Sequence, residues 1–154
     1  MYKHIMVPLD GSKLAEVVLP HVISIAKGCA VPKVTLVRVV PPLKFYGTEA
    51  DLPFMDMPNL EEASMKYARE YVSAQAKKLA AEGIEVHTKV IFGIVTEELL
   101  DFEKKNGVDL VVIATHGRSG VSRWVWGSVA DRILRGAKVP VLMVRPPGMG
   151  TNGI

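Results

Sequence analysis

The stretch "DLVVIATHGRSGVSRWVWGS", residues 109–128, decides the fold class of this chain. It begins with an almost wholly apolar run, typical of a strand buried on both faces of a parallel sheet. Three glycines follow at once, and the last of them opens a Gly-Ser pair before a helix-like stretch. Such a connection is either an ordinary loop or a backbone kept bare so that a ligand can lie against it.

The rest of the chain repeats this alternation of strand and helix. Patterns typical of strands occupy residues 4–9, 33–40, 84–91, 109–114 and 139–145. Helical spacing of apolar residues occupies 12–28, 60–82, 95–105 and 127–136. Five strands that alternate with helices predict an α/β fold: a five-stranded parallel sheet, doubly wound, with helices on both faces.

Capping residues mark where the helices begin and end. Ser12 is expected to cap the first helix, and Pro20 to bend it, since proline removes a backbone donor and clashes with the preceding turn. Asn59 and Glu62 stand in capping-box positions at the start of the second helix, and Gly83 is its predicted stop.

Composition limits the class of protein. The chain has 154 residues, which fits one domain, expected over 1–147 with an unstructured tail at 148–154. Apolar residues make up 49% and charged residues 23%, as in a soluble globular domain. No apolar run reaches the roughly 18 residues that span a bilayer, so no membrane contact is expected. A lone cysteine, Cys29, with no signal segment predicts the cytoplasm and argues against a metal-ligand cluster.

The basic residues are scattered. The net charge is +3, with no run of Lys or Arg, so a nucleic-acid partner is not expected. The connection over 41–59 is long and irregular, which is typical of a functional or a mobile loop; its aromatic residues at 45, 46 and 54 are candidates to cover a neighbouring site or a partner chain.

Ligands of doubly wound sheets bind at the carboxyl ends of strands, where the strand order reverses. Three loops lie there: "PLDGS" (8–12), "RVVPP" (38–42) and the loop after 114. Asp10 has two interpretations. It is a helix-start carboxylate that interacts with the helix dipole, or it accepts a hydrogen bond from a ligand hydroxyl such as that of a ribose.

The third loop suggests an anion site. Nine residues separate Gly117 from Gly127, and Ser128 follows where a helix begins. Unpaired N–H groups at a helix start bind anions, and Ser128 is expected either to cap the helix or to donate to a phosphate. The alternative is that Gly127 and Ser128 form an ordinary helix start without a ligand, as in any α/β protein. A histidine in the place of His116 is more often a donor that fixes a loop than a base. Trp124 and Trp126 are expected to be packing or partner-facing residues.

On these residues the chain resembles the universal stress proteins, from "HIMVPLDGS" to "VPVLMVRP". The resemblance implies a flavodoxin-like, Rossmann-like domain of the adenine nucleotide alpha-hydrolase type that often binds ATP. The family pattern is Gly-x-x-Gly, nine residues, then Gly-Ser or Gly-Thr. Here it is "ATHG", "RSGVSRWVW", "GS", with Ala114 in place of the first glycine.

The resemblance also implies a set of site residues. Contacts to adenine and ribose fall on the first two strand ends, further contacts on the fourth strand, and the phosphates on the last helix start. The candidates are Pro8, Leu9, Asp10, Val39, Ile113, Ala114, His116, Gly117, Gly127, Ser128 and Val129, with Arg118 as a charge partner. The ligand is ATP, ADP or AMP, with Mg²⁺ bridging phosphate oxygens. A side chain at 127 is expected to block a phosphate oxygen and leave the fold intact.

Three functions compete at this point: a nucleotide-binding regulatory module, an enzyme of phosphate chemistry, and a dimeric interaction protein with a vestigial pocket. The sequence has no "G-x-x-x-x-G-K-[ST]", so no catalytic residue is assigned and any turnover of ATP is expected to be slow. The binding module is therefore preferred. The last strand, 139–145, is expected at the sheet edge and to pair with its own copy in a homodimer, as the resemblance also implies.

Overall fold

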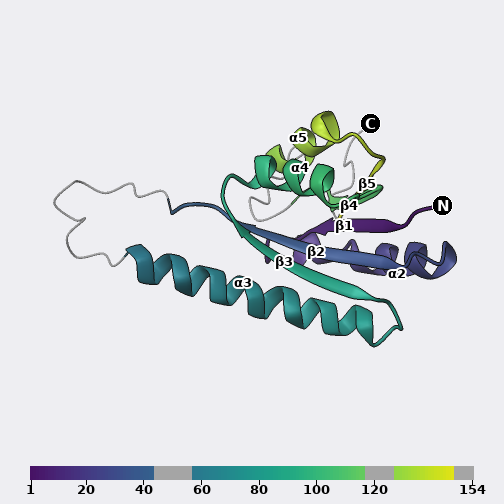
Figure 1. Ribbon diagram of the computed structural model, residues 1–154, viewed down its shortest axis with the longest axis horizontal. Helices are drawn as coiled ribbons and strands as arrows, with labels where there is room; N and C mark the ends of the chain where they lie inside the picture. Colours follow the sequence, from purple (N-terminus) through teal and green to yellow (C-terminus); the bar gives the residue numbers. More distant parts are fainter. Residues whose placement is uncertain (44–56, 117–126, 148–154) are drawn as a thin grey trace.

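Five parallel strands form the sheet, in the order β3-β2-β1-β4-β5 (Figure 1). The computed structural model describes residues 1–43, 57–116 and 127–147. The strands are β1 (His4–Pro8), β2 (Lys33–Val40), β3 (Val86–Phe92), β4 (Leu110–Ala114) and β5 (Val141–Val144). All five lie within two residues of the ranges predicted from the sequence. For β1 and β4 the reason is an almost continuous apolar run, which has few alternatives to a buried strand.

Helices cover both faces of this sheet. They are α1 (Lys13–Glu16), α2 (Leu19–Gly28), α3 (Met57–Ala80), α4 (Val95–Lys105) and α5 (Ser128–Gly136). One buried cluster joins the sheet to α1, α2 and α3, and a second joins it to α4 and α5. Figure 1 shows these layers, with α3 and α2 on one side and α4 and α5 on the other. The predicted fold class is confirmed.

The central strands carry the core. Every residue of β1 and of β4 is buried, as their continuous apolar runs predict. Side chains of β2 alternate between the two layers, with Leu36 in the α2 and α3 cluster and Val37 in the α4 and α5 cluster. Because β1 lies between β2 and β4, the chain reverses its direction of travel across the sheet at this point. Ligand sites of such sheets lie there.

Pro20 does more than bend a helix. The predicted single helix over 12–28 is two helices, with α1 ending at Glu16 and α2 beginning at Leu19. Pro20 is the second residue of α2, where the first N–H groups of a helix have no partner within it. Proline therefore destabilises α2 little at this position. In a continuous helix the same residue would remove a backbone hydrogen bond and its ring would clash with the preceding turn. The prediction of one bent helix was wrong.

The start of α3 also differs from the prediction. It begins at Met57, so Asn59 lies inside the first turn, and the predicted capping box with Glu62 was wrong. Pro58 suits this start for the same reason as Pro20 suits α2. The predicted stop is confirmed, since the turn after Ala80 contains Gly83 at φ +80°, a left-handed conformation that favours glycine.

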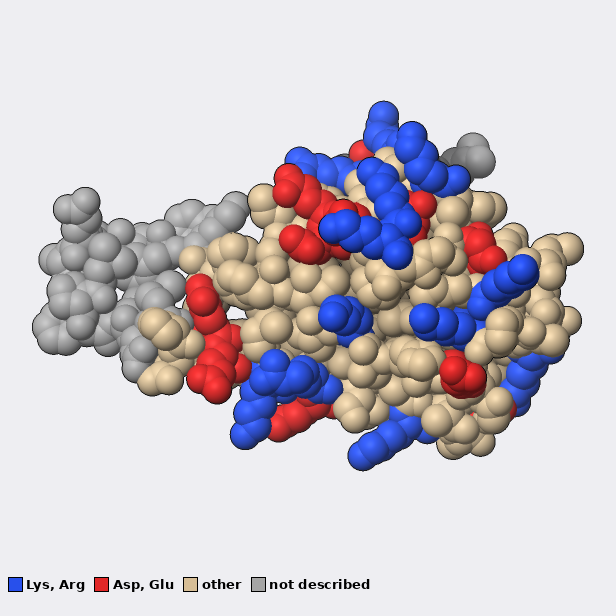
Figure 2. All heavy atoms as spheres, in the orientation of Figure 1, with Lys and Arg blue, Asp and Glu red and all other residues tan. Residues whose placement is uncertain are grey.

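The surface over α4 and α5 mixes both charges (Figure 2). Lys105 pairs with Asp101 at 2.8 Å, and Arg135 with Asp131 at 3.0 Å. At these positions of α4 and α5 the surface therefore carries paired positive and negative charges and no patch of a single sign. Within the described ranges, no helix is long and apolar enough to cross a membrane.

Some predictions fall outside the described residues. These are the aromatic residues at 45, 46 and 54, the loop residues Gly117, Arg118, Trp124 and Trp126, and the tail 148–154. The single domain over 1–147 likewise stays a prediction.

Candidate nucleotide site at the strand ends

A cavity of about 260 Å³ opens at the carboxyl ends of β1, β2 and β4. Ten of the twelve predicted site residues line it: Pro8, Leu9, Asp10, Val39, Ile113, Ala114, His116, Gly127, Ser128 and Val129. The other two, Gly117 and Arg118, lie outside the described residues. The fold thus brings three separate stretches of sequence to one place, while their contact with a nucleotide stays a prediction.

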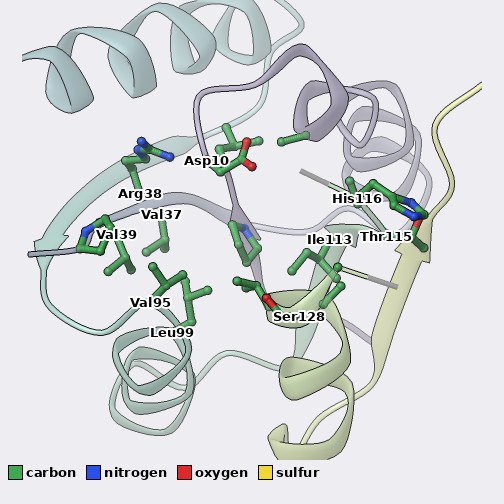
Figure 3. A pocket seen from close by; sticks show the side chains of 18 residues that line it. Asp10, Val37, Arg38, Val39, Val95, Leu99, Ile113, Thr115, His116 and Ser128 are labelled. Carbon is green, nitrogen blue, oxygen red and sulfur yellow. The ribbon is translucent and has the colours of Figure 1, made fainter. Parts of the chain in front are cut away.

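One half of the cavity is aliphatic (Figure 3). Val37 and Val39 project from the end of β2, and Val95 and Leu99 from the first turns of α4. Val37, Val39 and Leu99 are at most 4% exposed. The sequence prediction missed Val37, Val95 and Leu99. Two spacings could have found them: Val37 shares a strand face with Val39, and Val95 and Leu99 share a helix face at the carboxyl end of β3.

Asp10 lines the opposite side of the cavity (Figure 3). Its Oδ1 accepts hydrogen bonds from the backbone N–H of Ser12 at 2.9 Å and from the Ser12 hydroxyl at 2.6 Å. The Ser12 hydroxyl oxygen in turn accepts from the N–H of Ala15 at 3.1 Å, which confirms Ser12 as the cap of α1. Asp10 therefore organises the turn into α1, in agreement with its interpretation as a helix-start carboxylate. It also faces the cavity, as an acceptor for a ligand hydroxyl must.

Arg38 lines the same side of the cavity as Asp10 (Figure 3). It is 7% exposed and lies on β2 between two valines of the aliphatic half. Sequence reasoning missed it, because a single cation within an apolar strand is ordinarily assigned to the sheet rather than to a site.

The start of α5 closes the cavity on the β4 side. Gly127 is the N-cap, with its N–H donating to the carbonyl of Thr115 at 2.8 Å. Ser128 is the first residue of the helix, so the alternative that it caps α5 was wrong. Gly127, Ser128 and Val129 all line the cavity, so the amino end of α5 faces it. A helix start of this kind presents N–H groups and partial positive charge to an anion.

Gly127 has a packing role as well. A Cβ added there would lie 3.1 Å from the carbonyl oxygen of Thr115 and 3.8 Å from the Cα of His116. The backbone therefore approaches the end of β4 too closely for a comfortable side chain. The expectation that a substitution at 127 leaves the fold intact did not consider this contact, and it stays a prediction.

His116 and His4 both make side-chain hydrogen bonds within the fold. His116 shares a hydrogen bond of 2.9 Å with the hydroxyl of Thr115, which agrees with a loop-fixing role. His4 is buried, with Nδ1 donating to the carbonyl of Asn106 at 3.0 Å and Nε2 lying 2.8 Å from the hydroxyl of Thr35. Burial lowers the pKa of His4, so the neutral ring with Nε2 as acceptor is favoured.

The sequence model of the universal stress protein family matches residues 1–145. The chain belongs to the universal stress protein family. Universal stress protein MJ0531 of Methanocaldococcus jannaschii is 34% identical to it over 148 residues, covering 96% of this chain and 84% of that protein. The family resemblance expected from the sequence is confirmed.

Among solved universal stress proteins, the structure of MJ0577 is similar over 99% of both chains, with a TM-score of 0.80 and 26% identity. MJ0577 also comes from Methanocaldococcus jannaschii. The five-stranded α/β architecture is therefore that of the family.

Proposed function

We propose that this universal stress protein binds an adenine nucleotide, ATP, ADP or AMP, in the cavity at the strand ends and acts as a regulatory stress-response module. One observation carries the proposal. Residues assigned to a nucleotide from three distant stretches, around Asp10, Val39 and Gly127, line one cavity where the strand order reverses.

The chemistry of the walls matches the parts of a nucleotide. The aliphatic half, formed by Val37, Val39, Val95 and Leu99, suits the flat apolar faces of adenine. The carboxylate of Asp10 is an acceptor for ribose hydroxyls. The phosphates would then turn toward the amino end of α5.

The backbone N–H groups at that helix end would hold the phosphates. Ser128 and Val129 offer theirs at the first turn of α5, whereas the N–H of Gly127 already donates to the carbonyl of Thr115. Gly117 and Arg118 are proposed on the sequence alone. When bound, Mg²⁺ would neutralise part of the phosphate charge; no protein ligand for it is proposed.

Two family members support an adenine ligand. A universal stress protein has been solved in complex with cAMP; it is 20% identical, with a TM-score of 0.61 over 95% of this chain and 97% of its own. A family protein of Arabidopsis thaliana has been solved with AMP bound; it is 16% identical, with a TM-score of 0.63 over 95% of this chain and 93% of its own. At these identities the likeness is one of fold, so the lining residues of this chain remain the main support.

Binding is proposed without efficient turnover. The sequence has no Walker lysine to act on the phosphates, and none of the lining residues is assigned as a catalytic base. Slow ATP hydrolysis is the second candidate, and an interaction protein with a vestigial pocket is the third. The cytoplasm is the proposed location.

A homodimer through residues 139–145 is part of the proposal. Strand β5 is at the edge of the sheet and, within the described residues, pairs with β4 alone. Leu142 on this strand is 36% exposed. The open edge offers N–H and C=O groups that a second copy could satisfy about a two-fold axis.

Calorimetric titration of ATP, ADP, AMP and cAMP tests the binding proposal. Val95→Phe should fill the aliphatic half and abolish binding, whereas Ile94→Phe should not, since Ile94 is 54% exposed and lies outside the cavity. Circular dichroism checks that both variants fold. Wild-type protein that binds none of the four, or a folded Val95→Phe that binds as tightly as wild type, would refute the proposal.

A further inference from the structure

The short helix α1 lies between the cavity and the long helix α3. It has only four residues, Lys13–Glu16. A single turn is unstable alone, because nucleating a helix fixes several dihedral angles for one hydrogen bond. Contacts at its two ends must therefore fix the position of α1.

The first end is tied to the cavity. Asp10 accepts two hydrogen bonds from Ser12, and Ser12 caps α1 through the N–H of Ala15. Any displacement of α1 is thus transmitted to the carboxylate of Asp10. Ala15, the buried residue of α1, lines the same cavity.

The second end is tied to α3. Oε1 of Glu16, the last residue of α1, accepts from the phenol of Tyr71 at 3.2 Å and from the amide of Gln75 at 3.3 Å. Its other oxygen pairs with Lys13 at 3.2 Å. Gln75 is 4% exposed, and its own amide oxygen accepts from Lys78 at 2.9 Å. Glu16 is thus held by two side chains of α3 in a largely water-excluded setting.

The groups of the cavity act on this contact electrostatically. Burial, followed by the charge and hydrogen bond of Glu16, holds the pKa of Tyr71 well above its ordinary value. The phenol therefore stays protonated and can donate to Glu16. Asp10 adds to this rise of the pKa and Arg38 opposes it, so these two cavity residues lie within electrostatic reach of Tyr71.

We propose that Tyr71 and Gln75 are positioning residues of the nucleotide site: through Glu16 and α1 they hold Asp10 in place for the ribose, and they couple ribose binding to the docking of α3. The inference rests on the proposed function. It assigns that site a route of regulation, since a partner that binds or displaces α3 would change nucleotide affinity.

Coupling of this kind is reciprocal. If docking of α3 strengthens ribose binding, the nucleotide must strengthen docking of α3 by the same factor. Helix α3 runs for 24 residues and packs against β2 and β3, so its far end lies well away from the cavity. Occupancy of the cavity would therefore be detectable at a distant surface.

The test compares two ligands across two tyrosine variants. ATP carries the ribose hydroxyls that Asp10 would bind, and 2′,3′-dideoxy-ATP lacks them. Tyr71→Phe keeps the ring and removes the phenol that donates to Glu16. Tyr67→Phe is the matched control, one helical turn earlier and 61% exposed.

The wild type should prefer ATP over the dideoxy analogue. Tyr71→Phe should reduce this preference by at least about fivefold, the lower end of typical coupling factors, with little change in affinity for the analogue. Tyr67→Phe should keep the wild-type preference. A defect that was merely structural would weaken both ligands together.

Hydrogen exchange provides the second measurement. ATP should slow exchange across α3 in the wild type, and this protection should disappear in Tyr71→Phe. Glu16→Ala, which removes the acceptor from α1, should lower the ATP preference in the same way and serves if Tyr71→Phe does not fold.

Two failures are distinguishable. Wild-type protein that binds neither ATP nor the analogue defeats the proposed function, and the inference with it. Wild-type protein that binds ATP, with an unchanged preference in folded Tyr71→Phe and Glu16→Ala, defeats the coupling alone.

Discussion

Replacing Gly127 with alanine should destabilise the protein. The added Cβ would lie 3.1 Å from the carbonyl oxygen of Thr115, tighter than nine in ten such contacts. The carbonyl oxygen belongs to the backbone and the Cβ is attached directly to it, so no side-chain rotation can separate the two atoms. The N–H of Gly127 is itself bonded to this carbonyl at 2.8 Å, so relief of the contact must stretch that hydrogen bond.

The magnitude follows from two opposing effects. Overpacking a tight site costs about 1–3 kcal/mol. Backbone strain adds nothing, since φ −53° and ψ 139° at Gly127 suit alanine. Removing a glycine from the unfolded chain stabilises by about 0.4–1 kcal/mol. The net change predicted for Gly127→Ala is a loss of about 1 kcal/mol.

Urea denaturation at 25 °C measures this change, with Gly28→Ala as the matched control. Gly28 ends α2, and a Cβ there would meet no atom within 4 Å, so this variant should be as stable as wild type or slightly more so. ATP binding by Gly127→Ala should also weaken, because the start of α5 must shift. If Gly127→Ala proves as stable as Gly28→Ala, the close-approach argument is refuted.

Three further predictions concern the core, the edge and the first helix. Burial lowers the pKa of His4 from 6.5, so below that pH the unfolded chain binds more protons than the folded one, and stability should fall as the pH drops below 6.5. Urea denaturation at pH 7.5 and at pH 5.5 should show this loss of stability. The variant His4→Gln should reduce the loss, whereas the control His21→Gln, at an exposed position, should not. Leu142→Lys should weaken the proposed dimer at the β5 edge, and wild-type protein that sediments as a monomer at micromolar concentration would contradict the dimer. Ser12→Ala should cost about 1 kcal/mol through the lost cap and should also weaken ATP binding, since Asp10 loses the hydroxyl that orients it; unchanged stability in urea would contradict the cap.

Much of the fold was predictable because its signals are local. The apolar runs of β1 and β4 fit only a strand buried on both faces, and α4 ends where Asn106 and Gly107 stop it. The errors arose where two local signals competed. Pro20 was taken as a bend within a helix, although the same residue suits the start of a new one.

The site was predictable where its residues carry a pattern and unpredictable where only packing reveals them. Asp10 and Gly127 stand in recognisable loops. Arg38 lines the cavity because β2 ends beside β1, and no spacing in the sequence indicates this. The tie between Glu16 and Tyr71 joins residues 55 apart, so it too required the fold.

Methyl-detected NMR during titration with ATP tests the central claim most directly, because it locates the ligand rather than only detecting it. Saturable shifts are expected for the methyl groups of Val37, Val39, Val95 and Leu99, which line the aliphatic half of the cavity. A second hollow, at the amino ends of β2 and β3, provides the internal comparison through Val31 and Ile84. Shifts confined to Val31 and Ile84, or no saturable shift at all, would contradict nucleotide binding in this cavity.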